Sequence, residues 1–435
     1  MWLLGFAQEQ MLPDDINSKN WWMAGFGSNK PCTEVLDPLW CRAVALKNDG
    51  KCVALASCDL VSLQYDDIIE CREKINAEIP GAYDAINICC THTHAGIDSF
   101  GLWSNSDDYV GPDPEWMAIV KNAIVKAVVA AYKDLKEGKL FRSVATPKAL
   151  IMDIRIPVVI DNRLTRIHFI PADGSKETVI VHFNAHPESL DSGNTLVSSD
   201  FAGIARKAVE EKMDSNCVYF NGCVGGMQTV PQFYHVNGDP MTNVENCTTM
   251  GNSIAKIVIG MGDSQEVSPD NFYFANSDVW IPLYNEKFVW ASQGGLLKGR
   301  MQDNEDSPTG MDILTTVGYI EIGDIKLALI PGELFPEVAK GGFLHPRDAA
   351  NPEAEVETPV FEVMGNDGYN LVLGLANDEV GYILPENDFF VGGDMPYMDD
   401  SYDSTGRKHY EETNSLGPKT AKCVINALKD LIQAK

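Results

Sequence analysis

Short apolar runs that end in polar or glycine-rich turns recur along the chain and predict buried strands. The runs at 40–46 and 52–57 are separated by Asn48-Asp49-Gly50, a sequence typical of a hairpin turn. The run 85–90, with the sequence AINICC, is partly β-branched and bounded by polar residues, so it predicts a third strand. Further strands are predicted at 141–146, 178–183, 217–220, 272–282, 325–330 and 370–375.

Helical spacing of apolar residues alternates with these strands. Asp113-Pro114 opens the clearest helix, because Asp is a good N-cap and Pro suits the first turn, and Gly138 is predicted to close it. Other helices are predicted over 66–78, 199–213, 244–261, 334–340 and from 417 to the end. The pattern predicts an α/β fold: a mixed β-sheet core flanked by helices, with the active site at the carboxyl ends of strands. No linker divides the chain, so we expect one domain over 1–435.

Composition narrows the possible partners and compartments. The net charge of 34 − 62 = −28 opposes binding to nucleic acid, so we expect no such partner. No stretch approaches the ~18 apolar residues of a transmembrane helix, and the N-terminus lacks the basic region of a signal peptide. The 11 cysteines are odd in number and irregularly spaced, which favours free thiols in the cytoplasm. The sequence does not indicate an oligomeric state.

A histidine doublet, Thr91-His92-Thr93-His94, directly follows the predicted strand 85–90. Alternate residues of a strand point to the same side, so His92 and His94 are expected to share one face where the strand ends. Two imidazoles offered together are typical ligands of a transition metal such as zinc. The alternative is that backbone or carboxylate groups satisfy each histidine by hydrogen bonds.

Five predicted strands end in turns that carry groups able to do chemistry. These groups are the doublet, His186, the glycine-rich loop 222–226, Glu333 and Tyr382. The carboxyl ends of strands can converge at one edge of a sheet, and two or three histidines with one carboxylate form a plausible catalytic zinc set. Two alternatives stay open here: Glu333 could cap the following helix, and Tyr382 could be an ordinary half-buried aromatic residue.

Five motifs along the chain together resemble the neutral, non-lysosomal ceramidase family, and they occur in that family's order. The motifs are Thr91 to Gly96; Ala185-His186-Pro187 with Ser199-Asp200; Pro331-Gly332-Glu333; Gly374 to Asn377 with Tyr382-Ile383; and Tyr410-Glu411 with Leu416-Gly417-Pro418. The resemblance implies that zinc is held by His92, His186, Glu333 and Tyr382. It also implies that His94 contacts substrate or moves a proton, and a looser match makes Arg155 a donor to the developing oxyanion.

The chain also departs from the family pattern. Gly225 stands where ceramide-cleaving members carry a serine, and we expect no immunoglobulin-like C-terminal domain like theirs. The resemblance therefore implies a zinc-dependent hydrolase of catalytic-domain type that cleaves an amide bond in a small-molecule or lipid N-acyl substrate by metal-activated water. Two alternatives keep the fold: a metal-dependent esterase or small N-acyl amidase, and a binding protein without catalysis.

Overall fold

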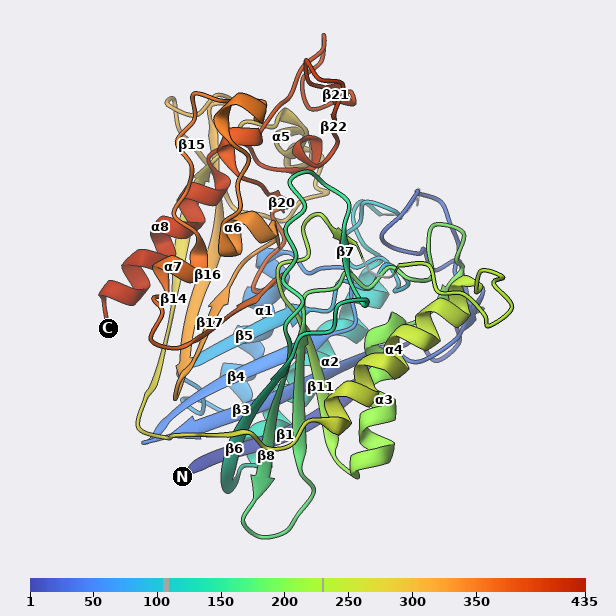
Figure 1. Ribbon diagram of the computed structural model, residues 1–435, viewed down its shortest axis with the longest axis vertical. Helices are drawn as coiled ribbons and strands as arrows, with labels where there is room; N and C mark the ends of the chain where they lie inside the picture. The colour runs from blue at the N-terminus through green and yellow to red at the C-terminus, as the bar shows by residue number, and fades with distance from the viewer. Residues whose placement is uncertain (105–108, 229–230) are drawn as a thin grey trace.

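The computed structural model of the chain describes residues 1–104, 109–228 and 231–435, and its framework is a large mixed sheet (Figure 1). The strand order is β11-β9-β8-β6-β1-β3-β4-β5, with β13 beside β6; β4 is parallel to β5 and β9 to β11, and the other neighbours are antiparallel. Its strands are β1 (Trp2–Gln10), β3 (Trp40–Asn48), β4 (Lys51–Cys58), β5 (Ala85–Cys90), β6 (Lys136–Ala145), β8 (Leu164–Pro171), β9 (Thr178–Phe183), β11 (Asn216–Asn221) and β13 (Gln265–Val267).

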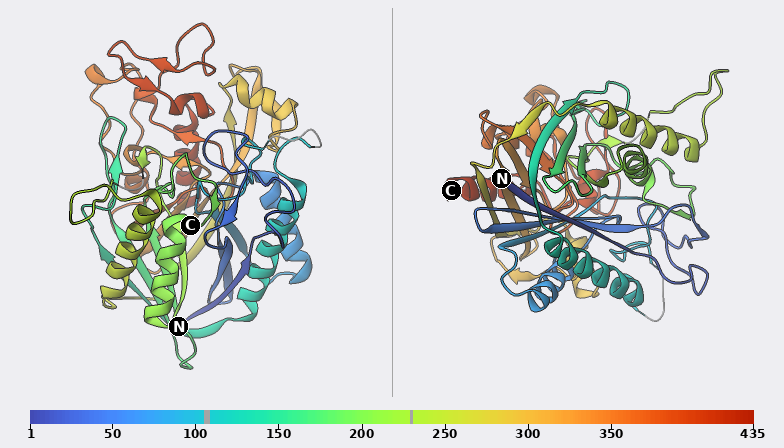
Figure 2. Two further views of the ribbon diagram at one scale, coloured as in Figure 1. Left: turned by 90° about the vertical axis from the view of Figure 1, so that its right-hand side faces the viewer. Right: turned by 90° about the horizontal axis from the view of Figure 1, so that it is seen from below.

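A second sheet, of order β14-β16-β17-β19 with β15 beside β16, packs on one face of the first. It consists of β14 (Phe272–Pro282), β15 (Met301–Asp303), β16 (Met311–Ile322), β17 (Ile325–Leu329) and β19 (Tyr369–Leu373). Four helices cover the other face of the large sheet: α1 (Tyr65–Glu78), α2 (Pro114–Lys133), α3 (Asp200–Met213) and α4 (Asn243–Gly260). Helix α8 (Thr420–Gln433) covers the outer face of the small sheet, which completes four layers (Figure 2).

Short elements complete the described chain. They are β2 (Glu34–Val35), β7 (Met152–Asp153), β10 (Leu196–Val197), β12 (Met227–Gln228), β18 (Glu333–Leu334), β20 (Tyr382–Ile383), β21 (Ser401–Tyr402), β22 (Lys408–His409), α5 (Glu286–Gln293), α6 (Pro336–Lys340), α7 (Val360–Val363) and 3-10 turns at Pro346–Asp348, Glu386–Asp388 and Glu411–Asn414. Across the described ranges, the helices are all too short or too polar to cross a membrane.

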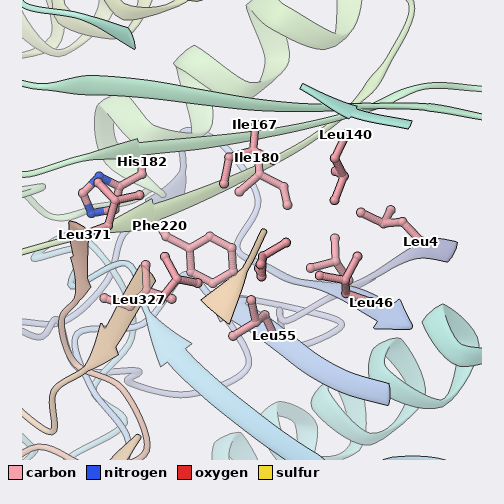
Figure 3. Close-up of a pocket in the computed structure, with 13 residues that line it drawn as sticks. Leu4, Leu46, Leu55, Leu140, Ile167, Ile180, His182, Phe220, Leu327 and Leu371 are labelled. Atoms are coloured by element: carbon pink, nitrogen blue, oxygen red, sulfur yellow. The ribbon is translucent and has the colours of Figure 1, made fainter. Parts of the chain in front are cut away.

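The two faces of the large sheet carry different residues. Small residues of β3 and β4, such as Ala43 and Ala54, face the helices, and a Cβ at Gly5 would lie 2.1 Å from the Ala131 carbonyl oxygen of α2. Larger aliphatic and aromatic residues fill the space between the sheets and leave an apolar cavity of about 30 Å³ (Figure 3). At its edge His182 donates from Nε2 to the Val372 carbonyl (2.7 Å). The cavity is too small for an organic ligand.

The predicted α/β class with mixed sheets flanked by helices is confirmed, and β5 and β14 have the predicted bounds. The predicted end of the long helix at Gly138 is wrong, because α2 stops at Lys133 and Gly138 pairs with Trp2 and Pro171 inside β6. Sheet pairing, which the local pattern does not encode, outweighs the glycine signal there. The single domain over 1–435 stays a prediction.

The strand ends predicted to carry chemistry meet at one edge of the two sheets. Cys89 of β5 forms a bridge with Ala376 just beyond β19, and a Cβ at Gly374 would lie 2.3 Å from the Gly222 carbonyl oxygen after β11. Such backbone contacts need glycine or short turns, which is why these turns are rich in both. The turns after β5, β9, β11, β17 and β19 are thereby brought around one point.

Candidate metal centre

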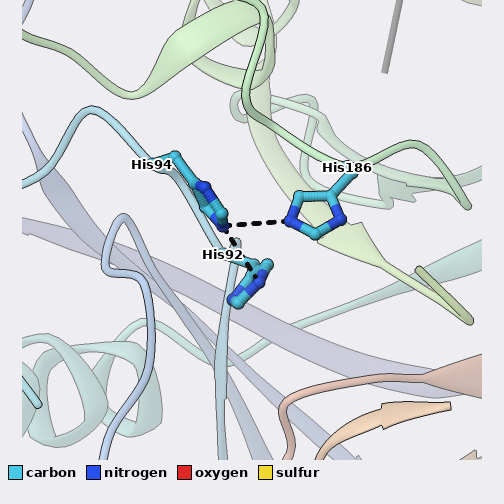
Figure 4. A group of neighbouring side chains, drawn as sticks. All are labelled: His92, His94 and His186. Carbon is cyan, nitrogen blue, oxygen red and sulfur yellow. Dashed lines mark hydrogen bonds between the residues drawn. The ribbon is translucent and has the colours of Figure 1, made fainter. Parts of the chain in front are cut away.

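Three imidazoles from two strand ends face one another at this point (Figure 4). The Nε2 atom of His94 lies 3.2 Å from Nε2 of His92 and 3.0 Å from Nε2 of His186. One ring nitrogen from each residue falls within a sphere where all separations are below 4.8 Å, a spacing that a single metal ion can bridge. His92 and His186 are buried, and His94 is nearly so.

The backbone fixes how His92 presents its ring. His92 has φ of 66°, a left-handed conformation that is uncommon for residues other than glycine, and its amide donates to the Leu60 carbonyl (2.9 Å). Its Nδ1 lies 2.6 Å from the Val61 carbonyl oxygen. A carbonyl only accepts, so Nδ1 carries the proton and, in the neutral ring, Nε2 keeps a free lone pair toward the centre. This second hydrogen bond is typical of metal-binding histidines.

Glu333 brings a carboxylate to the same point. Its Oε1 lies 3.5 Å from His92 Nε2 and its Oε2 lies 3.8 Å from His186 Nδ1. Helix α6 begins only at Pro336 with Phe335 as its N-cap, so Glu333 does not cap that helix. Strand β18 pairs in parallel with β20 and places Glu333 opposite Tyr382. Tyr382 packs edge-on against Phe335, and burial together with Glu333 raises the pKa of its phenol well above the usual value.

The electrostatics favour the neutral form of two imidazoles, His94 and His186, beside one carboxylate. Burial, helped by the neighbouring histidines, lowers the pKa of His94 well below its ordinary value and that of His186 to about 4. Burial also lowers the pKa of His92, but Glu333 outweighs it and leaves that pKa raised. Burial by itself raises the pKa of the Glu333 carboxyl, but His92 outweighs this effect and leaves that pKa lowered. In the neutral form these rings offer lone pairs to a metal.

The described residues cannot satisfy this cluster with hydrogen bonds of their own. Neutral His94 has at most one Nε2 proton for the two nitrogens beside it, and its Nδ1 has no hydrogen-bond partner among the described residues. Oε2 of Glu333 is likewise buried without such a partner in the described part of the chain. Buried lone pairs that face one another are costly, and a cation resolves the conflict. The donor set therefore fits a divalent metal that prefers nitrogen and carboxylate ligands.

Comparisons with known proteins agree with this architecture. No family model matches the chain. The crystal structure of neutral ceramidase from Pseudomonas aeruginosa superposes on 100% of this chain and 74% of its own, with a TM-score of 0.76 and 15% identity. This chain has the neutral ceramidase fold. A ceramidase complexed with C2 gives a TM-score of 0.75 at 16% identity and covers 100% and 75% of the two chains.

In sequence, the chain is 24% identical over 183 residues to the neutral ceramidase of Pseudomonas aeruginosa strain PAO1. That alignment covers 38% of this chain and 27% of the relative, so it spans about a quarter of the relative's length. The family resemblance predicted from the five motifs is confirmed: the chain is a divergent, ceramidase-like protein.

Arg155 makes its contacts away from the three imidazoles. Its guanidinium donates to Glu411 (2.8 Å) and Glu412 (2.7 Å), lies 3.5 Å from an Asp388 carboxylate oxygen, and stacks 5.3 Å over the Phe335 ring. It therefore reaches the centre only through Phe335, the neighbour of Tyr382. A role as oxyanion donor stays a prediction, and it requires the guanidinium to leave part of this carboxylate network.

The structure adds two carboxylates that the sequence motifs did not single out. Glu188 follows His186 by two residues, and its Oε2 lies 3.9 Å from Nδ1 of His94. Glu379 accepts the Gly381 amide (2.7 Å) and, with Tyr382, lines a cleft of about 680 Å³ that opens over the imidazoles. Glu188 could have been found from the sequence, because it directly follows the Ala-His-Pro motif. Nothing in the sequence indicated that Glu379 lies at this site.

Gly225, the position of the family serine, packs closely against the backbone of the segment that carries Glu333. A Cβ there would lie 2.6 Å from the Glu333 carbonyl oxygen and 2.6 Å from the Phe335 ring, while the Gly225 amide donates to the Leu334 carbonyl (3.1 Å).

Because of this close approach, we expect Gly225→Ser to displace the strand that carries Glu333, to lower the thermal midpoint and to weaken metal binding by about tenfold or more. Calorimetry and zinc titration measure both effects. Gly193→Ser is the control, because a Cβ at Gly193 meets no atom within 4 Å; equal behaviour of the two variants would contradict this account.

Glu337 in α6 lies next to the Pro-Gly-Glu turn. We expect this residue to make the stability of the folded protein depend on pH. Its side chain is 1% exposed, and burial raises its pKa to about 8 although Arg155 opposes the shift. Between the unfolded value of 4.5 and 8 the native state keeps a proton that the unfolded state releases, so stability falls as pH rises through this window. Glu337→Gln removes this cost, which is on the order of a few kcal/mol.

We expect the midpoint of Glu337→Gln to exceed that of the wild type by more at pH 8 than at pH 5, as measured by thermal denaturation. Glu362→Gln is the control, since that residue is exposed. A difference for Glu337→Gln that stays constant or shrinks with rising pH would show that Glu337 is ionised in the native state.

Proposed function

We propose that this protein is a zinc-dependent hydrolase that cleaves the amide bond of an N-acyl substrate. The observation that carries the proposal is that His92, His94 and His186 meet the Glu333 carboxylate beside one cleft, which His92, His94 and Glu333 line. Zinc suits a set of imidazole nitrogens and a carboxylate better than the oxygen-preferring cations do. The ceramidase fold adds support, because the relatives' printed names denote cleavage of an N-acyl compound.

In this proposal the ligands are His92, His186 and Glu333, with Tyr382 as the fourth. When bound, zinc lowers the pKa of a coordinated water to about 7 and polarises a carbonyl oxygen. His94 is neutral and faces the same point through Nε2, so it can take a proton from the attacking water. Glu188, beside Nδ1 of His94, would orient that ring.

The cleft suits an acyl chain next to a polar reaction centre. Apolar residues form much of its wall, including Phe26, Phe100, Leu102, Phe288 and Leu297. At the position of the family serine, Gly225 offers no hydroxyl, so water rather than that side chain would attack the carbonyl. The amide C–N bond breaks, the hydroxyl of water joins the carbonyl carbon, and the amine leaves with a proton.

We place this reaction in the cytoplasm. The support is that all 11 cysteines, each within the described residues, are free thiols, and ten of them are buried. Free thiols persist in reducing compartments.

The test is a turnover assay on protein stripped with a chelator and then reloaded with zinc. The substrates are an N-acyl amide and the ester with the same acyl chain. Cleavage of the amide only after zinc is restored supports the proposal. Cleavage of the ester alone would replace it with a metal-dependent esterase, and no turnover with unchanged thermal stability on chelation would favour a binding protein without catalysis.

A further inference from the structure

One basic residue that lines the cleft has no acidic partner among the described residues. Lys287 is the single lysine or arginine among the described residues that line the cleft, and it is half-buried there. Its ammonium makes no ion pair or hydrogen bond within the described ranges, and burial alone lowers its pKa. This is unusual in a chain with 62 acidic residues for 34 basic ones, where a carboxylate partner is easily found. An unpaired, partly desolvated ammonium in a substrate cleft is a binding group for an anion.

The position of Lys287 is firmly fixed. It lies in the first turn of α5, where its amide donates to Asn285 Oδ1 (3.0 Å). The Asn285 side chain is fully buried and donates to the carbonyls of Thr413 (3.1 Å) and Ser415 (2.9 Å). The Tyr284 amide donates to Leu416 (2.9 Å), the first residue of the Leu-Gly-Pro motif. The motif therefore anchors the start of α5 beside the cleft, and little backbone entropy would be lost when Lys287 binds a ligand.

The neighbours of Lys287 divide the cleft into two parts. Phe288 and Ala291 of α5, with Leu297 just after it, extend the apolar wall. His92, His94 and Glu333 form the polar part of the wall. The cleft therefore offers an apolar wall for an aliphatic chain, polar groups for a carbonyl and one basic residue, Lys287, for an anionic group.

We propose that Lys287 binds an anionic group in the amine part of the substrate, so that this enzyme acts on N-acyl amino acids or their sulfonate and phosphate counterparts. The proposal rests on the hydrolase function above and narrows its substrate class. It excludes ceramide as the preferred substrate, because a ceramide headgroup carries no charge. The products are a fatty acid and a free amino acid or its analogue.

The test compares three amides with the same acyl chain, two anionic and one neutral, in zinc-loaded protein. The anionic substrates are N-dodecanoylglycine and N-dodecanoyltaurine, and the neutral one is N-dodecanoylethanolamine. We expect the wild type to prefer the anionic amides in kcat/KM by about tenfold or more. Lys287→Met should lower this preference by about 10- to 100-fold, the effect of one charge-assisted hydrogen bond, and mainly through KM. Lys287→Arg should keep most of it, and Lys207→Met, at an exposed site on α3, should leave it unchanged.

Equal loss on both classes of amide in Lys287→Met, or no preference in the wild type, would overturn the proposal. Calorimetric binding of the same compounds separates it from the proposed function. If no amide is hydrolysed but the anionic compounds bind more tightly and lose that advantage in Lys287→Met, the hydrolase fails and the role of Lys287 stands. If all three are hydrolysed without a charge preference, the hydrolase stands and the role of Lys287 fails.

Discussion

Replacement of His92 or His186 by alanine is expected to remove both the bound zinc and the hydrolytic activity. The wild type should hold about one zinc per chain and each variant less than about a tenth of that, because three protein ligands are the usual minimum of a catalytic zinc site. Loss of groups that only orient a ligand costs 10- to 100-fold, so loss of a ligand should lower kcat/KM by about a thousandfold or more. Elemental analysis and the amide assay measure the two effects.

Two controls make this result specific to the centre. His235→Ala, at an exposed histidine whose ring is 3.5 Å from Glu245, should keep full zinc content and activity. Far-ultraviolet circular dichroism should show that the ligand variants remain folded. Full zinc content in His92→Ala and His186→Ala, or unchanged turnover in zinc-free variants, would mean that the imidazoles do not form a metal site.

Breaking the buried ion pair between Asp59 and Arg206 is expected to destabilise the protein more than any surface change. The pair is bidentate at 2.7 and 2.6 Å, and its side chains are 0% and 1% exposed. Asp59 also accepts the Trp40 amide (2.9 Å) at the end of β4, beside the turn that carries the histidine doublet. Removing one partner leaves an uncompensated buried charge, so Arg206→Met or Asp59→Leu should cost roughly 3–5 kcal/mol of unfolding free energy.

Denaturant unfolding of these variants tests the role of the pair. The double variant Asp59→Leu with Arg206→Met should recover part of the lost stability, because neither charge is then left unpaired. Asp400→Asn, which breaks an exposed pair with Lys408 (2.8 Å), should leave the midpoint unchanged. A small effect of the single variants, equal to that of Asp400→Asn, would show that water reaches the buried pair.

The sequence predicts the strands well where their apolar runs are short and bounded by turns, as at 85–90 and 272–282. It does not predict strand order, because the pairing of β1 with β6 joins segments more than 100 residues apart. The same limit explains the misplaced end of α2. The division into two sheets could not be predicted either, because it depends on packing between side chains that are far apart in the sequence.

For the site, the spacing within Thr-His-Thr-His indicates that two imidazoles share a face, and the structure brings them together with His186. The sequence could not show that His94 Nε2 lies about equally close to the Nε2 atoms of His92 and His186. This arrangement depends on the left-handed turn at His92. It also could not show that Glu411 and Glu412 hold Arg155. Motifs identify residue types, whereas the partners of each residue come from the fold.

The measurement that tests the metal centre most directly is a crystal structure with anomalous diffraction data at the zinc absorption edge. We expect one peak among the imidazoles, about 2.0–2.2 Å from nitrogens of His92 and His186 and from an oxygen of Glu333. The same map shows whether the phenol oxygen of Tyr382 supplies the fourth ligand. Crystals grown with zinc that show no peak at this point would mean that these residues do not hold a metal.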